Sequence, residues 1–135
     1  MGYVKAQSGR DPKTGDFVTG GFEAEFNQAI DNLEAILKAA GSALDRVVKA
    51  QIEFVDESDL DAMNRIYGER FNDPLPARTS FGAAFLWKGA EVQIDCIPTV
   101  GWVSPQRGTV RRRGPAATSP SRPTPTPRHG AWGPR

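Results

Sequence analysis

Apolar residues recur at helical spacing in two stretches of the chain. Within residues 22–40 they stand three or four positions apart over four turns, with charged residues between them, and Gly41 follows as a helix stop. Residues 60–71 repeat the spacing, and Ser58 is the expected N-cap, with acidic residues in the first turn. The pattern therefore predicts two amphipathic helices.

Three further stretches alternate apolar and polar residues with a period of two, which is typical of half-buried strands. The first covers residues 45–56, and the other two lie on either side of Lys88-Gly89, which we expect to join them as a hairpin. In each stretch one row of side chains is mainly apolar and is expected to face the helices. These rows are Val48, Ala50, Ile52 and Phe54; Thr79, Phe81, Ala83 and Phe85; and Val92, Ile94 and Cys96.

The alternate rows of these strands would give the sheet an unusually polar second face. Its expected members are Lys49, Gln51, Glu53, Arg78, Ser80, Glu91, Gln93 and Asp95. The order helix, strand, helix, strand, strand, with both helices on the opposite side, predicts a two-layer α+β domain. Residues 1–8 are too short for a complete further strand, although Tyr3-Val4 fits the end of one.

Composition divides the chain after Val100. Residues 1–100 hold all 16 acids and ten of the 17 lysines and arginines, a formal charge of −6, whereas residues 101–135 hold seven arginines and no acid. The second segment also holds seven of the 11 prolines and lacks periodicity, which predicts a disordered basic tail. Its run Arg111-Arg112-Arg113 could touch RNA, but an acidic domain repels phosphate, which disfavours nucleic-acid binding.

Few residues in the predicted domain could carry chemistry. The one histidine, His129, lies in the tail, so a Ser-His or Cys-His nucleophile pair has no base. Zinc ligands and a phosphate-binding glycine loop are also missing from the sequence. Cys96 falls on an apolar row, which predicts a buried, inert thiol and fits a reducing compartment. No apolar run approaches the ~20 residues that cross a bilayer, so we expect a cytoplasmic protein with no membrane partner.

Arg78 is the residue most suited to binding a ligand. Its guanidinium can hold a carboxylate through two parallel hydrogen bonds. An ordinary ion pair across the strands, with Glu53, Glu91 or Asp95, is the alternative that the residues leave open. Glu91 and Asp95 could in turn form a carboxylate pair for acid–base work, but a solvated polar face is the preferred interpretation.

The order and spacing of several segments within residues 7–100 resemble the RidA (YjgF) family of imine and enamine deaminases. The matching segments include Asp11-Pro12-Lys13-Thr14-Gly15-Asp16, Asp31-Asn32-Leu33, Met63-Asn64-Arg65-Ile66-Tyr67, Pro76-Ala77-Arg78-Thr79-Ser80 and Val92-Gln93-Ile94-Asp95-Cys96-Ile97. The resemblance implies a chorismate-mutase-like α+β fold and homotrimers with sites between subunits. It also implies hydrolysis of 2-imino acids, such as those in equilibrium with 2-aminoacrylate, to 2-keto acids and ammonia, with no cofactor and no metal.

The resemblance also implies roles for individual residues. Arg78 matches the family's carboxylate-binding arginine, and Asn64 matches a site asparagine on the second helix. Ser80 stands where many active members carry cysteine, and Gln93 where many carry a glutamate thought to hold the water. Gly9 falls in the family's Ser-Gly element. We therefore expect Arg78 and Gln93 to be catalytic, and Arg78, Asn64, Ser80 and Gly9 to bind substrate.

The departures from the family pattern define the alternatives. An amide at Gln93 can orient a water but cannot accept its proton, so a non-catalytic metabolite-binding trimer is the second hypothesis. An RNA-acting translation inhibitor is a more distant third. Family members begin with a further strand that residues 1–8 are too short to supply. We therefore expect a RidA-like domain over residues 1–100, shortened at its N-terminus, and an unrelated tail over residues 101–135.

Overall fold

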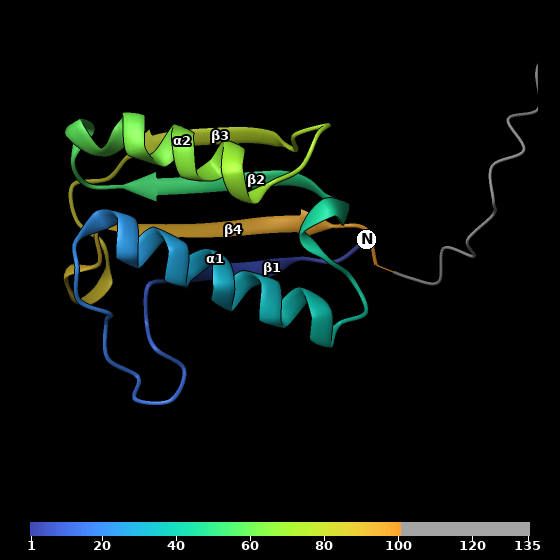
Figure 1. Cartoon of the computed structure of the whole chain (residues 1–135), viewed down its shortest axis with the longest axis horizontal. Coiled ribbons are helices and arrows are strands. Elements are labelled where there is room, and N and C mark those ends of the chain that lie inside the picture. The colour runs from blue at the N-terminus through green and yellow to red at the C-terminus, as the bar shows by residue number, and fades with distance from the viewer. Residues whose placement is uncertain (101–135) are drawn as a thin grey trace, which may run out of the picture. The chain divides into compact units, whose positions relative to one another are not determined.

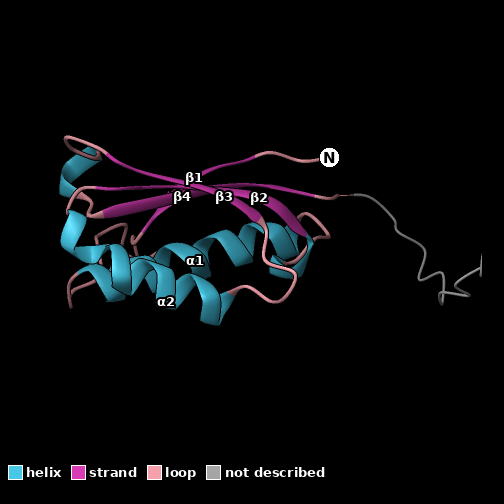
Figure 2. Ribbon diagram, turned by 90° about the horizontal axis from the view of Figure 1, so that it is seen from above, coloured by secondary structure: helices cyan, strands magenta, loops and turns pink. Residues whose placement is uncertain are grey.

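The structure, a computed structural model, describes residues 1–100. Within them a four-stranded sheet carries both α-helices on one face (Figures 1 and 2). The elements are β1 (Val4–Ser8), α1 (Phe22–Ala39), β2 (Val47–Phe54), α2 (Leu60–Arg70), β3 (Ala77–Gly82) and β4 (Val92–Pro98). The predicted two-layer α+β fold is confirmed. The expected disordered tail, its arginine run and His129 lie outside the described residues.

The strands follow the order β1-β4-β2-β3 across a mixed sheet. β4 is antiparallel to both β1 and β2, whereas β3 runs parallel to β2 at the sheet edge, as a connection through α2 requires. The predicted hairpin is therefore wrong, because β2 separates β3 from β4. The link between them includes a 3₁₀ turn at Trp87–Gly89, in which Lys88 has a φ of 53°.

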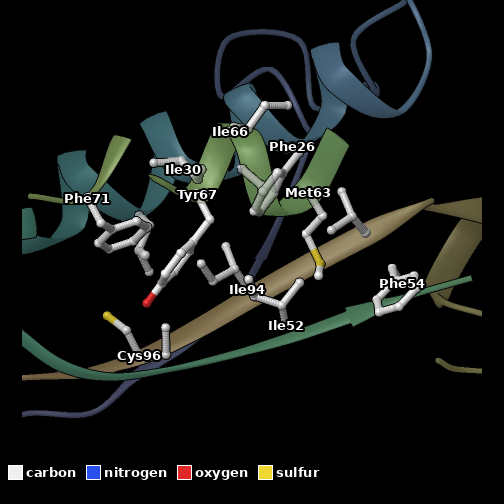
Figure 3. Packing of buried hydrophobic residues seen from close by; sticks show 14 of the residues in the cluster. Phe26, Ile30, Ile52, Phe54, Met63, Ile66, Tyr67, Phe71, Ile94 and Cys96 are labelled. Carbon is white, nitrogen blue, oxygen red and sulfur yellow. The ribbon is translucent and has the colours of Figure 1, made fainter. Parts of the chain in front are cut away.

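The hydrophobic core fills the space between the sheet and the two helices. Figure 3 shows Met63 and Tyr67 of α2 reaching toward Ile52 of β2 and Ile94 of β4. These two strands are central in the sheet and present their apolar rows to the helices, as predicted. The residues with no exposed surface include Phe26, Ala29, Ile30, Leu33, Leu37, Ala50, Ile52, Met63, Val92 and Ile94.

One predicted core position at the start of β2 is wrong. Val48 is 42% exposed, and Val47, at 6%, is buried in its place. The pairing of β2 with β4 shifts register between Val47 and Lys49. An irregularity of this kind moves the preceding residues to the other sheet face, so the strict alternation assumed from the sequence fails before Lys49.

The ends of the helices agree only partly with the sequence. α1 ends as predicted, with Gly41 at a φ of 77° just beyond it. The predicted N-cap at Ser58 is wrong, because the Asp56 carboxylate accepts hydrogen bonds from the Ser58 N–H and hydroxyl, at 2.9 and 2.8 Å. A 3₁₀ turn at Glu57–Asp59 then leads into α2. No helix in residues 1–100 is both long and apolar enough to cross a membrane.

Residues 1–8 contribute more to the sheet than the sequence indicated. β1 is a five-residue edge strand that pairs with β4, where Val4 lies opposite Cys96 and Ser8 opposite Gln93. The register shifts between Val4 and Gln7. This irregularity breaks the alternation over so short a strand, which explains why the periodicity did not predict it.

Candidate functional site

Arg78 lies on the helix-covered face of the sheet, not on the open face. In the parallel pairing of β3 with β2, Arg78 stands opposite Ala50 and Ser80 opposite Ile52, both fully buried under the helices. Paired residues share a sheet face, so the predicted placement of Arg78 and Ser80 is wrong. Phe81, expected in the core, instead lies opposite Glu53 and is 45% exposed.

Two residues of α2 fix the Arg78 side chain. Its Nη2 donates a hydrogen bond to Asn64 Oδ1 at 2.7 Å, and its Cζ stands 4.8 Å from the centre of the Tyr67 ring. Asn64 and Tyr67 are three residues apart and therefore share one side of the helix. The guanidinium is therefore held between the edge strand β3 and α2.

No acidic side chain of residues 1–100 forms an ion pair with Arg78. The predicted ion-pair alternative is wrong, because Glu53 and Asp95 lie on the opposite face of the sheet. The Ser80 hydroxyl, two residues along the same strand row, is buried with no hydrogen-bond partner in the described structure. A guanidinium that pairs with no acid of residues 1–100, two residues from a hydroxyl without a partner there, is an arrangement that can bind a carboxylate.

Gln93 lies in a different part of the molecule. It stands on β4 opposite Glu53, on the open face, and lines a cleft of about 650 Å³ beside β1 together with Asn32 and Trp87. Two strand spacings, about 10 Å, separate β3 from β4. A single chain therefore brings Arg78, Asn64 and Ser80 together but does not bring Gln93 to them.

Gly9 has a packing role in the structure. A methyl group at this position would lie 2.5 Å from the Glu25 Cα and 2.6 Å from its carbonyl oxygen. The residue is buried where the chain leaves β1 and passes close to α1. Burial raises the pKa of the Glu25 carboxyl, while the hydrogen bond it accepts from the Glu91 N–H lowers it. The predicted contact of Gly9 with substrate remains a prediction.

The open face of the sheet carries a partly buried acidic cluster. Glu53 is 7% exposed; its Oε1 accepts a hydrogen bond from Gln51, and its Oε2 is buried with no partner among the described residues. Burial raises the pKa of Asp95, and the Glu53 charge adds to the shift, whereas Lys49 opposes it. The acidic side chain whose charge raises the pKa of Asp95 is thus Glu53, not Glu91 as the spacing along one strand indicated.

The remaining chemical expectations concern the thiol and metal ligands. Cys96 is 2% exposed, and burial raises the pKa of its thiol to about 12, which confirms the predicted buried and inert cysteine. Within residues 1–100, no group of three or more His, Cys, Asp or Glu side chains is placed to hold a metal ion.

A mixed four-stranded sheet with two helices on one face is the α+β fold shared with solved structures described as L-PSP endoribonuclease and RidA. The sequence model described as Endoribonuclease L-PSP matches residues 1–100. The chain belongs to this family, the RidA family.

Relatives and solved structures agree with this assignment. The chain is 40% identical to a goat and 37% identical to a human protein, both named 2-iminobutanoate/2-iminopropanoate deaminase, over 99 residues that cover 73% of this chain and 72% of each relative. The crystal structure of RidA from Psychrobacter sp. PAMC 21119 superposes with a TM-score of 0.70 at 36% identity, covering 73% of this chain and 79% of that one.

The sequence-based prediction of the site missed one residue. Tyr67 falls within the helix predicted over residues 60–71 and received no site role, although its ring contacts the Arg78 guanidinium. The signal that could have revealed it was present: Asn64 and Tyr67 share a helix side, and Asn64 was already a candidate. What concealed the contact was the assignment of Arg78 to the wrong face of the sheet.

Proposed function

We propose that this protein hydrolyses 2-imino acids and their enamine tautomers to 2-keto acids and ammonia, and that Arg78 holds the substrate carboxylate. The observation that carries the proposal is a guanidinium fixed by Asn64 and Tyr67 but paired with no acid of the described residues. Family membership and relatives named imine deaminases, at about 40% identity, support the same reaction.

Hydrolysis of an imine needs few catalytic groups from the protein. A C=N carbon is already electrophilic, so binding the carboxylate, orienting the carbon and placing a water account for the catalysis. Arg78 and Ser80 offer donors to the carboxylate. Gln93 would orient the attacking water through its amide, and because an amide cannot accept a proton, the proton leaves to solvent or to the departing amine.

The separation of Arg78 from Gln93 supports a site shared between copies of the chain. We propose a homotrimer in which the open sheet faces meet and the cleft of one subunit approaches Arg78 of the next. Two features of the open face support its burial: Phe81 is 45% exposed there, and the buried Glu53 Oε2 has no partner within residues 1–100.

The full-length chain is expected to show a light-scattering mass of about three times 14.7 kDa. A Phe81→Asp variant should lower this mass, because it places a charge next to Glu53 on the face that the proposed interface buries. Leu60→Asp is the matched control, because Leu60 is 38% exposed but lies on α2, in the helix layer on the other side of the sheet. A monomeric wild-type chain contradicts the proposed assembly.

The reaction is tested by generating 2-aminoacrylate with a pyridoxal-dependent dehydratase and following 2-keto acid release with and without the protein. Acceleration supports the proposal, and an unchanged rate contradicts it. Binding of 2-oxobutanoate without acceleration would favour the second candidate, a non-catalytic metabolite-binding trimer. That candidate is favoured by the amide of Gln93 at the position of the family's glutamate.

A further inference from the structure

We infer that Tyr67 is a positioning residue for Arg78: its ring face holds the guanidinium in the orientation that accepts a carboxylate. The inference rests on the proposed function and deepens it, because it adds a residue that acts on the substrate only through Arg78. Three observations carry it: the contact between the two side chains, the rigidity of the tyrosine, and the absence of an acidic partner for Arg78 within the described residues.

The contact has the geometry of a cation–π interaction. The Arg78 Cζ stands 4.8 Å from the centre of the Tyr67 ring, within the ~6 Å over which such contacts are attractive. The ring occupies one side of the guanidinium, and the Asn64 Oδ1 takes one Nη2 hydrogen at 2.7 Å. A planar guanidinium has five N–H donors, so these contacts orient it and leave most donors free for a ligand.

Tyr67 itself is held rigidly. It is 3% exposed, and its ring packs against Phe71 at a centroid distance of 4.6 Å. Its hydroxyl donates a hydrogen bond to the Pro76 carbonyl at 3.2 Å, and Pro76 directly precedes β3. Burial raises the pKa of Tyr67, while the Arg78 charge opposes the rise. A ring that cannot turn away limits the rotamers that a long arginine side chain adopts at an exposed strand edge.

The position of Tyr67 separates this role from that of an ordinary core residue. Met63 and Ile66 contribute to the same buried layer of α2, but Tyr67 is the residue of that layer whose ring extends under a charged group. Orienting Arg78 before substrate arrives lowers the entropy that binding must remove from its side chain. Loss of the ring should therefore weaken binding of a carboxylate more than binding of an uncharged analogue.

The test compares the affinities of the full chain for 2-oxobutanoate and for 2-oxobutanamide, measured by calorimetry. Tyr67→Leu is expected to weaken binding of the acid about fivefold, the size of one lost cation–π contact, and to leave the amide within twofold of wild type. Tyr67→Phe keeps the ring and should retain the affinity for the acid within twofold. Tyr67→Met removes the ring with less loss of volume and provides the same comparison if Tyr67→Leu does not fold.

Ile66→Val is the matched control, because it removes buried volume from the same layer of α2 while leaving the Tyr67 ring, its Phe71 neighbour and the contact with Arg78 in place. It should lower stability and leave both affinities within twofold. Equal weakening of acid and amide in Tyr67→Leu, or no weakening of either, overturns the inference. A wild-type chain that does not prefer the acid contradicts the proposed role of Arg78 instead, so the two failures are distinguishable.

Discussion

Replacing Arg78 with alanine is expected to lower kcat/KM for 2-aminoacrylate-derived imine about 100-fold while leaving the fold intact. A charge-assisted pair of hydrogen bonds to a carboxylate contributes roughly 1.5–3 kcal/mol, and a loss of about 2.7 kcal/mol corresponds to a factor of about 100. The side chain is exposed, and its one hydrogen bond within the described residues goes to Asn64, so little stability depends on it. Keto-acid release in the dehydratase-coupled assay measures the effect.

Two variants make this experiment specific. Arg78→Lys keeps the charge but loses the planar fork, so it should recover only part of the activity. Arg65→Ala removes a different exposed arginine. Arg65 lies on α2 next to Asn64 and forms ion pairs with Glu23 and Glu69. Activity should remain within twofold of wild type in Arg65→Ala. Equal activity of Arg78→Ala and wild type would show that the carboxylate binds elsewhere.

Gly9→Ala is expected to lower the free energy of unfolding by about 3 kcal/mol. The added methyl group meets the backbone of Glu25 at 2.5–2.6 Å, and a helix backbone cannot turn aside as a flexible side chain can. Overpacking of this kind typically lowers stability by about 1–3 kcal/mol. A clash with the main chain is expected at the upper end of that range. Chemical denaturation of the full chain, followed by circular dichroism, measures the change.

Gly68→Ala provides a control in which the free energy of unfolding is expected to rise. Gly68 lies within α2, and a methyl group there meets no atom within 4 Å. Alanine should therefore stabilise the helix by roughly 0.5–1 kcal/mol. If Gly9→Ala were as stable as wild type, the close passage of the chain over α1 would be looser than the structure shows. Gly9 would then be free for the substrate contact that the family resemblance implies.

Elements with a regular pattern were predicted well. The apolar stripe of α1 identified the helix to within one residue of its observed end at Ala39, because four turns of 3.6-residue spacing leave no alternative. The apolar rows that face the helices were predicted correctly in β2 from Ala50 onward, and in β4 at Val92, Ile94 and Cys96. These strands are central and covered by helices, so burial is strong enough to impose the alternation.

Elements at the edge of the sheet were predicted poorly. β3 has one neighbour strand and lies at the margin of the helical layer, so Arg78 and Ser80 can stand on its helix side while Phe81 is exposed on the other. Alternation separates two rows but does not say which row faces inward when neither is fully covered. For the same reason the pairing of β3 with β2 could not be distinguished from a hairpin with β4.

The sequence by itself determined which residues could serve this protein as a ligand site. Arg78, Asn64 and Ser80 stand in segments specific enough to indicate the RidA family, and the scarcity of titratable groups restricted the chemistry. Only the tertiary structure decided how those residues relate. Parallel pairing of β3 with β2 places the Arg78 guanidinium against the Tyr67 ring and on the sheet face opposite Glu53. Gln93 lies on β4, two strands away from Arg78. Strand order depends on contacts between segments far apart in the chain, which local periodicity does not encode.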